Sequence, residues 1–197
     1  MNYDEFIIDM LRQSEELKIQ AKFEESIKIL NKVITEVPEC FEAYEELGDN
    51  YLSVRETAKA EKALKQAIKI NPKSSNAHYL LGFLFSLDQN WDDSVKELAT
   101  ADELLPNHPE ILRCLGWSCY NQNRKSQKGV AILERSRNLC PGDPNILCDL
   151  GVCYMNSENY QQAIPLFEEV LAVAPNSEQA KECSVFLKIL KSPDFES

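Results

Sequence analysis

Cysteines are the residues of this 197-residue chain that most invite a search for metal binding or nucleophilic chemistry, because there are seven of them. Cys114 and Cys119, like Cys148 and Cys153, are five residues apart. On a helix, side chains at that spacing point about 140° away from each other, so neither pair can hold one ion. An odd number of cysteines in a chain of this length is also untypical of a disulfide scaffold. We expect reduced thiols that pack as small apolar side chains, and no metal site.

The sequence also contains few residues that could form an enzyme active site. The chain has two histidines, of which His78 falls on a predicted packing face and His108 lies beside a proline in a predicted turn. Neither a nucleophile elbow nor a glycine-rich phosphate loop occurs, since the six glycines are spread along the chain. We predict that the protein is not an enzyme and that it binds no cofactor.

The elements that position these residues follow a repeat of 34 or 35 residues. A Leu-Gly pair recurs at Leu47-Gly48, Leu81-Gly82, Leu115-Gly116 and Leu150-Gly151, and proline recurs at Pro38, Pro72, Pro106, Pro141 and Pro175. Two independent series with one period indicate that a single structural unit is copied along the chain.

Each unit has the periodicity of two helices. Tyr44, Leu47 and Tyr51 are spaced to share one face of a first helix, and Ala60 and Leu64 are spaced to share one face of a second. The proline that follows ends the second helix, because proline lacks the N–H and disfavours helix in the residue before it. The unit is therefore predicted to be a helix hairpin.

This unit resembles the tetratricopeptide repeat (TPR). The family pattern W-x2-L-G-x2-Y…A-x3-F…A…P appears here as Tyr44-x2-Leu47-Gly48-x2-Tyr51, Ala60-x3-Leu64-x2-Ala67 and Pro72. The resemblance implies an all-α fold, a right-handed solenoid of five TPR helix hairpins plus a C-terminal capping helix. It gives repeats at about residues 7–40, 41–74, 75–108, 109–143 and 144–177. We expect residues 1–191 to form a single domain.

Three local features accompany the repeats. The capping helix is expected at about residues 178–191, after Asn176 and Ser177 as N-cap candidates, with a flexible tail at 192–197. The fourth repeat has one extra residue, which we place in a longer polar turn around residues 121–128 that carries Arg124, Lys125 and Lys128. Pro165 falls inside a predicted helix and is expected to bend it.

In proteins of this family the first helix of each hairpin lines the concave side, so the resemblance indicates where a ligand would bind. Counted from the repeat glycines, positions −6, −3, +1 and +4 lie opposite the packing face; we call this surface the groove face. As partner-binding residues there we predict Tyr79, Phe83, Trp117, Tyr120, Arg113, Glu42, Glu45, Asp49, Asn76, Asn145, Val152 and Met155.

Both parts of this set allow two interpretations. The aromatic residues Tyr79, Phe83, Trp117 and Tyr120 either form a patch that binds a partner or fill a narrow superhelical interior. The acidic residues either form a solvated helix face or attract Lys and Arg of a bound segment. Some family members grip the C-terminal carboxylate of chaperone tails with basic residues, but the acidic side chains here would repel a carboxylate.

Charge and hydropathy restrict the partner classes. The chain has 21 basic and 32 acidic residues and a net charge of −11, which excludes a generic nucleic-acid binder. The longest apolar stretch, residues 79–87, is far shorter than the roughly 20 residues of a transmembrane helix. Asp4, Glu5 and Asp9 replace the basic start of a secretory signal, so we expect a cytoplasmic protein without membrane insertion.

These observations predict a non-catalytic interaction module or scaffold. Its concave TPR groove would bind a protein or peptide segment with apolar or aromatic anchors and basic residues. One alternative is a self-associating assembly subunit, a homo-oligomer formed through the groove or the terminal helices. Another is a chaperone-like TPR adaptor, which no particular residue favours.

Overall fold

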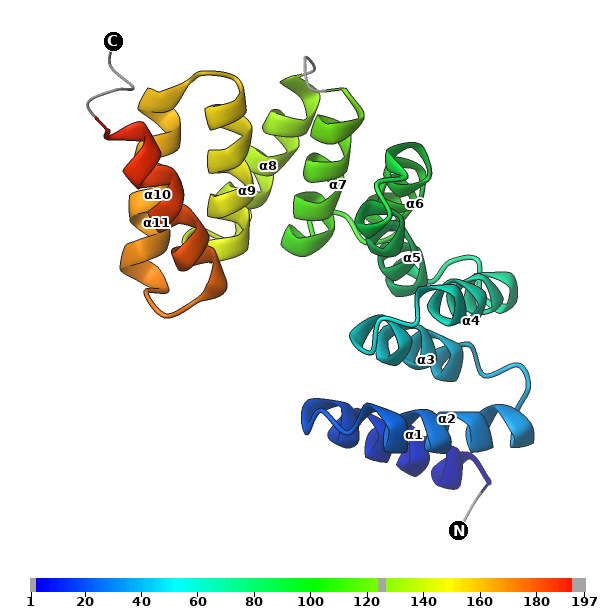
Figure 1. Ribbon diagram of the computed structural model, residues 1–197. Helices are drawn as coiled ribbons and strands as arrows, with labels where there is room; N and C mark the ends of the chain where they lie inside the picture. The colour runs from blue at the N-terminus through cyan, green and yellow to red at the C-terminus, as the bar shows by residue number, and fades with distance from the viewer. Residues whose placement is uncertain (1–2, 124–126, 193–197) are drawn as a thin grey trace. The chain divides into compact units, whose positions relative to one another are not determined.

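The computed structural model describes residues 3–123 and 127–192, and within these ranges the chain forms eleven α-helices and no strand (Figure 1). Residues 1–106 and 107–197 form two compact units, which are considered separately below as unit 1 and unit 2. The all-helical fold class is confirmed. A single continuous domain over residues 1–191 stays a prediction.

Unit 1 contains three helix hairpins. Its helices are α1 (Tyr3–Ile19), α2 (Phe23–Glu36), α3 (Phe41–Ser53), α4 (Thr57–Ile70), α5 (Ser75–Leu87) and α6 (Trp91–Leu104). The two helices of each hairpin pack against each other, and consecutive hairpins are joined by packing of α2 on α3 and of α4 on α5.

Unit 2 continues the same scheme and ends in a single helix. Its helices are α7 (Pro109–Gln122), α8 (Gln127–Leu139), α9 (Pro144–Asn156), α10 (Tyr160–Val173) and α11 (Glu178–Leu190). Helix α11 packs against α10 and α9, as predicted for a capping helix. Its N-cap is Ser177, whose side chain accepts a hydrogen bond from the Ala180 N–H at 3.0 Å.

The helix boundaries are consistent with the five predicted repeats. Four hairpins have three residues between their helices, whereas four residues separate α7 from α8, where the extra residue was predicted. Of the basic residues predicted for that turn, Lys128 belongs to α8, and Arg124 and Lys125 lie outside the described residues. Pro165 lies within α10, which continues to Val173.

The hairpins close tightly at the repeat glycines. A Cβ on Gly48 would lie 2.5 Å from Cγ of Leu64 in the partner helix, and one on Gly151 would lie 2.5 Å from Cε1 of Phe167. Real side chains do not approach so closely, so the two helices can meet at this distance only because the glycines have no Cβ. The glycines thus bring the leading helix of each hairpin close to its partner.

The thiols occupy the helix interfaces. Six of the seven cysteines are buried, Cys140 is partly buried, and none forms a disulfide. This confirms the expectation of reduced thiols that pack as small apolar side chains.

Candidate functional site

Groove-face residues of neighbouring leading helices contact each other in unit 1. Lys18 of α1 places Nζ 2.6 Å from Glu46 Oε2 and 2.9 Å from Asp49 Oδ2, both on α3. One repeat further along, Asn76 of α5 donates a hydrogen bond from Nδ2 to Glu45 Oε2 of α3 at 3.1 Å. The predicted face of α1, α3 and α5 is therefore one continuous surface cross-linked by polar contacts.

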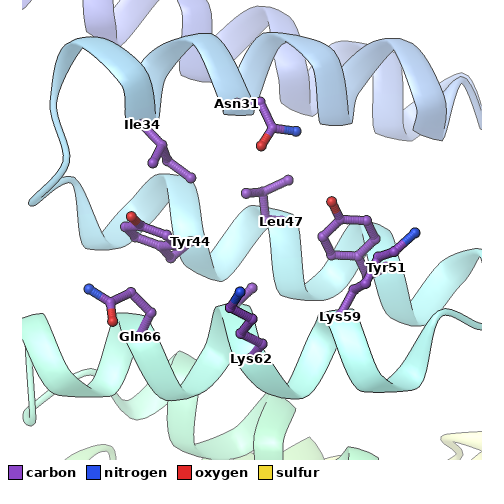
Figure 2. A pocket seen from close by; sticks show the side chains of 9 residues that line it. Asn31, Ile34, Tyr44, Leu47, Tyr51, Lys59, Lys62 and Gln66 are labelled. Atoms are coloured by element: carbon purple, nitrogen blue, oxygen red, sulfur yellow. The ribbon is translucent and has the colours of Figure 1, made fainter.

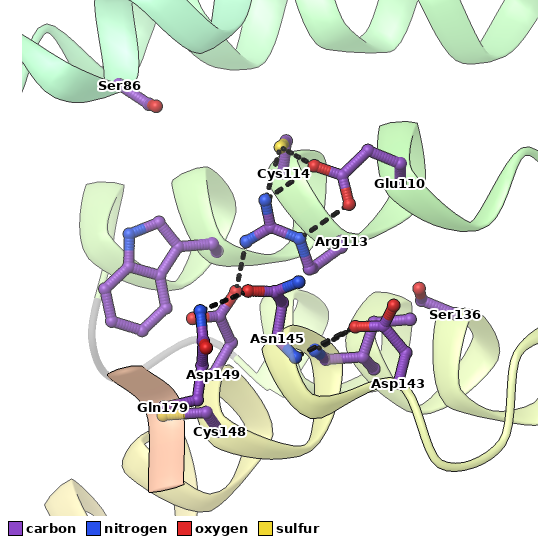
Figure 3. Close-up of polar contacts among 12 residues, drawn as sticks. Ser86, Glu110, Arg113, Cys114, Ser136, Asp143, Asn145, Cys148, Asp149 and Gln179 are labelled. Atoms are coloured by element: carbon purple, nitrogen blue, oxygen red, sulfur yellow. Dashed lines mark hydrogen bonds and ion pairs between the residues drawn. The ribbon is translucent and has the colours of Figure 1, made fainter. Parts of the chain in front are cut away.

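Unit 2 has the same kind of cross-links (Figure 3). Arg113 of α7 donates from Nη1 to Asp149 Oδ2 of α9 at 2.6 Å and holds Glu110 of its own helix through Nε and Nη2, at 2.8 and 2.6 Å. Gln179 of α11 donates from Nε2 to Asn145 Oδ1 of α9 at 2.6 Å. The groove faces of α7, α9 and α11 thus also lie side by side.

The structure corrects the expectation of a set of open carboxylates. Glu45 is only 8% exposed and accepts hydrogen bonds from Ser74 Oγ and Asn76. Asp49 shares the ammonium group of Lys18 with Glu46. Glu42 is exposed. Carboxylates spaced along one helix face are drawn into contacts with the neighbouring repeats, so only part of the predicted acidic surface is open.

Arg113 is an interior cross-link of the groove face, with 16% of its side chain exposed. Burial by itself lowers the pKa of a guanidinium, but the hydrogen bonds and charges of Glu110 and Asp149 outweigh it and raise the pKa of Arg113. For Asp149 burial dominates, and the pKa rises to about 6 although Arg113 lowers it. Because Arg113 is already paired with Glu110 and Asp149, a partner at this cluster would contact paired polar groups and not a free cation.

Tyr120 is buried, contrary to the expectation that its ring lies open on the groove face. Its side chain is 2% exposed, and its hydroxyl donates a hydrogen bond to the Cys153 carbonyl at 3.2 Å. Helix α8 approaches closely here, since a Cβ on Gly129 would be only 2.5 Å from the Tyr120 backbone nitrogen. The Tyr120 ring lies in the core cluster of unit 2, which includes Leu133 of α8 and Cys153 of α9.

The other predicted aromatic residues are partly exposed. In unit 1, the rings of Tyr79 and Phe83 stack with their centroids 6.4 Å apart and an angle of 23° between their planes. In unit 2, Trp117 packs against the core together with Val152 and Met155, and all three remain partly accessible. Each unit therefore offers an apolar part of its groove face. Their role in binding a partner stays a prediction.

Sequence reasoning missed the contribution of α11. Continuing the glycine-based register by 34 residues past Gly151 assigns Gln179, Glu182, Phe186 and Ile189 to the groove face. Gln179 indeed bonds to Asn145, and Phe186 packs against the core of unit 2 while remaining partly exposed. The signal was thus present in the spacing, although α11 lacks the glycine that marks the other leading helices.

The residues most suited to catalysis are engaged in packing. His78 is buried, with 11% of its side chain exposed, and its ring places Nδ1 2.6 Å from Glu97 Oε2 and Nε2 3.2 Å from the Pro72 carbonyl oxygen. Burial is the main cause that raises the pKa of Cys114 to about 12, so this thiol remains protonated near neutral pH. Among the described residues, no group of three or more His, Cys, Asp or Glu side chains is arranged to hold a metal ion.

Membrane insertion has no candidate element in the described part of the chain. None of its helices combines the length and the apolar composition that a membrane span requires.

Comparison with known families agrees with this architecture. The TPR family matches residues 51–117 and again residues 144–177, together about half of the chain. The chain belongs to the tetratricopeptide repeat family. Members of this family are typically non-catalytic protein–protein interaction modules.

Two curated relatives of the TPR protein are similar over most of its length. It is 27% identical over 142 residues to the type IV pilus assembly protein PilF of Pseudomonas aeruginosa, which covers 70% of this chain and 55% of that protein. It is 25% identical over 178 residues to the BBSome complex member BBS4 homolog of Drosophila melanogaster, which covers 90% of this chain and 36% of that protein. The TPR protein thus spans about half the length of these relatives, or less.

Solved structures show the same fold. The structure of Pseudomonas aeruginosa PilF has a TM-score of 0.77 at 15% identity and covers all of this chain and 97% of that one. The crystal structure of YrrB, described as a TPR protein with an unusual peptide-binding site, has a TM-score of 0.68 at 17% identity and covers 89% and 90%. At such identities the likeness concerns the fold alone.

Proposed function

We propose that the TPR protein is a non-catalytic scaffold that holds a segment of a partner protein on its groove face. The observation that carries this proposal is the stacked pair Tyr79 and Phe83, which stays partly exposed although α5 already buries a separate apolar face. Aromatic rings provide a large contact area at a small cost in side-chain entropy, which makes them frequent anchors of protein interfaces.

Unit 2 supplies a second apolar contact of the same kind. Trp117, Val152 and Met155 pack against the core of unit 2 and remain partly accessible. Trp117 follows Arg113 by four residues on α7, and Val152 follows Asp149 by three residues on α9, so each shares a helix face with a member of the paired polar cluster. A central apolar contact beside polar groups that are already paired is typical of a binding surface, because little charge has to be desolvated on association.

The favoured partner segment has basic residues beside its apolar anchors. Glu42, Glu45, Glu46 and Asp49 lie on α3, and Lys18 contacts two of them, Glu46 and Asp49. Four carboxylates are thus matched by one ammonium group, so this part of unit 1 remains negative. Such a potential favours a cationic segment and accelerates its association more than it adds affinity. Nucleic acid is disfavoured by the same potential.

The absence of enzymatic activity is part of the proposal. It is supported by the paired, buried ring of His78 and by the raised pKa of Cys114, which leave neither group open to a substrate. The seven unpaired cysteines support a reducing compartment such as the cytoplasm.

A peptide-display experiment tests the groove. Random 12-residue peptides would be selected on the wild-type chain, and the dissociation constants of the enriched peptides would be measured by calorimetry. We expect sequences that combine aromatic with basic residues. Tyr79→Ala should weaken the peptides that bind unit 1, and Trp117→Ala those that bind unit 2, by about tenfold or more, as removal of an interface anchor does.

The matched control is Val185→Ala on α11, which also removes an exposed apolar side chain but lies outside the groove face. It should change the dissociation constant less than about twofold. If Tyr79→Ala and Trp117→Ala are folded by circular dichroism and bind the selected peptides as the wild type does, the groove has no part in recognition.

A second candidate function, self-association, is favoured by the terminal helices. Ile8 of α1 is 65% exposed and Ile189 of α11 is 50% exposed, and Phe6 and Val185 of the same two helices are also exposed. Terminal faces with such apolar groups can form head-to-tail contacts. Sedimentation velocity over a wide concentration range tests self-association. Oligomers that dissociate in the Ile8→Glu variant support this function, and a protein that is monomeric at every concentration excludes it.

A further inference from the structure

Unit 1 has a pocket away from the groove face (Figure 2). It lies between α2, α3 and α4 and has a volume of about 470 Å³, within the range of ligand-binding cavities. Tyr44 and Tyr51 project from α3 on either side of Leu47, and Lys59 and Lys62 reach the pocket from α4. Counted at 100° per residue, Tyr44, Leu47 and Tyr51 point almost opposite to Glu42, Glu45 and Asp49, so the pocket and the groove face occupy different sides of α3.

The pocket combines apolar walls with cationic groups. Tyr44 and Tyr51 are partly exposed, and Lys59 Nζ lies 5.7 Å from the centre of the Tyr51 ring and 3.3 Å from Glu56 Oε1. Lys62 is exposed and has no ion pair or hydrogen bond from its side chain to any described residue. The pocket therefore offers two aromatic rings and one unpaired ammonium group.

The positive charge extends along α4. This helix carries four lysines and a single acidic residue, although the whole chain has a net charge of −11. Lys62 and Gln66 also line a neighbouring hollow of about 450 Å³, which continues past Lys65 to Lys69. Lys65 is paired with Glu61 at 2.6 Å, whereas the side chain of Lys69, like that of Lys62, contacts no described acidic group. A basic strip thus leads away from the pocket.

The fold alone does not require these lysines. Unit 2 has a pocket of about 460 Å³ between α8, α9 and α10, lined by Tyr154 in the repeat position of Tyr51. There Gln162 takes the place of Lys59 and Pro165 the place of Lys62, and the Tyr154 hydroxyl donates to Glu134 Oε1 at 2.7 Å. The pocket positions that carry lysines in unit 1 are thus uncharged at the equivalent places of unit 2.

We propose that unit 1 carries a second binding site, for an acidic protein segment. An aromatic or aliphatic side chain of that segment enters the pocket between Tyr44 and Tyr51, and carboxylates beside it pair with Lys62 and Lys69. Charge complementarity selects this occupant, because a basic segment would be repelled by α4 and an uncharged one would leave the lysines without a counter-charge.

The spacing of the lysines sets the length of the segment. Lys62 and Lys69 are seven residues apart on one helix, which corresponds to about 10 Å along the axis. An extended chain covers that distance in about three residues. A segment of roughly six to eight residues therefore reaches from the pocket to the end of the basic strip.

The test uses a fluorescein-labelled octapeptide with one Phe flanked by Asp and Glu, titrated with the full chain in an anisotropy assay. We expect binding that weakens as salt is added. It should be about tenfold weaker with Lys62→Glu, with Asn and Gln in place of the peptide carboxylates, or with Ala in place of the Phe.

Lys96→Glu is the matched control, because Lys96 is exposed at the same repeat position of α6 and lines neither hollow. It should change binding less than about twofold. Equal losses for Lys62→Glu and Lys96→Glu overturn the proposal, and so does undiminished binding of the amide peptide. Displacement of the peptide by single-stranded RNA or anionic vesicles at lower concentration than by unlabelled peptide would instead reveal a general polyanion surface.

This inference is independent of the proposed function of the groove face. Tyr79→Ala and Trp117→Ala should leave the binding of the acidic octapeptide unchanged, and Lys62→Glu should leave the binding of groove-selected peptides unchanged. The two experiments therefore show separately whether the groove face and the pocket of unit 1 bind their peptides.

Discussion

Arg113 of α7 and Asp149 of α9 form an ion pair, with Nη1 and Oδ2 2.6 Å apart, that joins two consecutive hairpins of unit 2. Only 16% of the arginine side chain and 20% of the aspartate side chain are exposed. The pair connects the repeats on the groove face, yet burial raises the pKa of Asp149 to about 6. Burial is the largest cause of this rise in the pKa of Asp149, the charges of Glu110 and Glu182 add to it, and Arg113 opposes it.

Stability should consequently depend on pH through Asp149. Its pKa is raised on folding from 3.8 to about 6, so the folded state binds the proton more tightly, and this stabilisation is lost as pH rises from about 4 to above 6. Asp149→Asn resembles the protonated form at every pH. We expect it to match the wild type near pH 4 and to be more stable near pH 8 by about 1 to 3 kcal/mol.

Urea unfolding at a series of pH values measures this difference. Asp88→Asn, at an exposed turn position, controls for the general effect of removing one negative charge. A less stable Asp149→Asn variant at pH 8 would mean that the attraction to Arg113 exceeds the cost of burial.

Tyr120 should contribute to folding and not to recognition. Tyr120→Phe removes the hydroxyl that donates to Cys153 and is expected to cost about 1 kcal/mol, whereas Tyr120→Ala opens a cavity and should cost about 3 to 5 kcal/mol. Thermal unfolding measures both. The folded Tyr120→Phe variant should bind groove-selected peptides with wild-type affinity. A tenfold loss of affinity would show that Tyr120 takes part in binding.

The contact of Gly48 with Leu64 should make alanine at position 48 destabilising. Alanine favours a helix interior by about 1 kcal/mol over glycine, but its Cβ would lie 2.5 Å from the Leu64 side chain. We expect a net loss of about 1 to 3 kcal/mol in the free energy of unfolding. In a Leu64→Ala background the same substitution should be neutral or stabilising, because the clashing atoms are gone.

A glycine without such a neighbour provides the comparison. Gly142 has a φ of +82° and nothing within 4 Å of a Cβ, so Gly142→Ala should cost about 1 to 2 kcal/mol through backbone strain alone. This loss should be the same with or without Leu64→Ala. Equal behaviour of Gly48→Ala in both backgrounds would show that the close approach of α3 and α4 does not determine its effect.

Lys18 should moderate the negative potential of the groove face. Lys18→Met removes the cation that contacts Glu46 and Asp49, and we expect a basic groove-selected peptide to associate several-fold faster at low ionic strength. At high salt the variant and the wild type should associate at the same rate. Stopped-flow fluorescence measures both conditions, and Lys28→Met, on the exposed surface of α2, is the control for the loss of one positive charge.

Several features were predictable because they depend on local spacing. The Leu-Gly and proline series placed the helix boundaries, and the polar residue before α11 located its N-cap at Ser177. The glycine register also identified residues of neighbouring leading helices that contact each other, such as Asn76 with Glu45. The same register would have included Gln179 if it had been extended past Gly151.

Other features depend on contacts between segments far apart in the sequence. Tyr120 occupies a groove-face position on its own helix, but residues of α8 and α9, among them Leu133 and Cys153, form the core cluster in which it is buried. Asp49 belongs to an acidic stripe, but Lys18, 31 residues earlier, is close enough to pair with it. The spacing of residues along one helix does not show which residues of other helices cover or pair with their side chains.

The sequence by itself determined the repeat, the helix hairpins and the side of each leading helix that lies opposite its packing face, because these follow from the fixed period of the α-helix. Only the tertiary structure decided which of those side chains remain accessible, and it also revealed the pocket beside Tyr44, Tyr51 and Lys62. Exposure and pairing depend on how closely separate helices approach, and that distance is set by the side chains of both helices together.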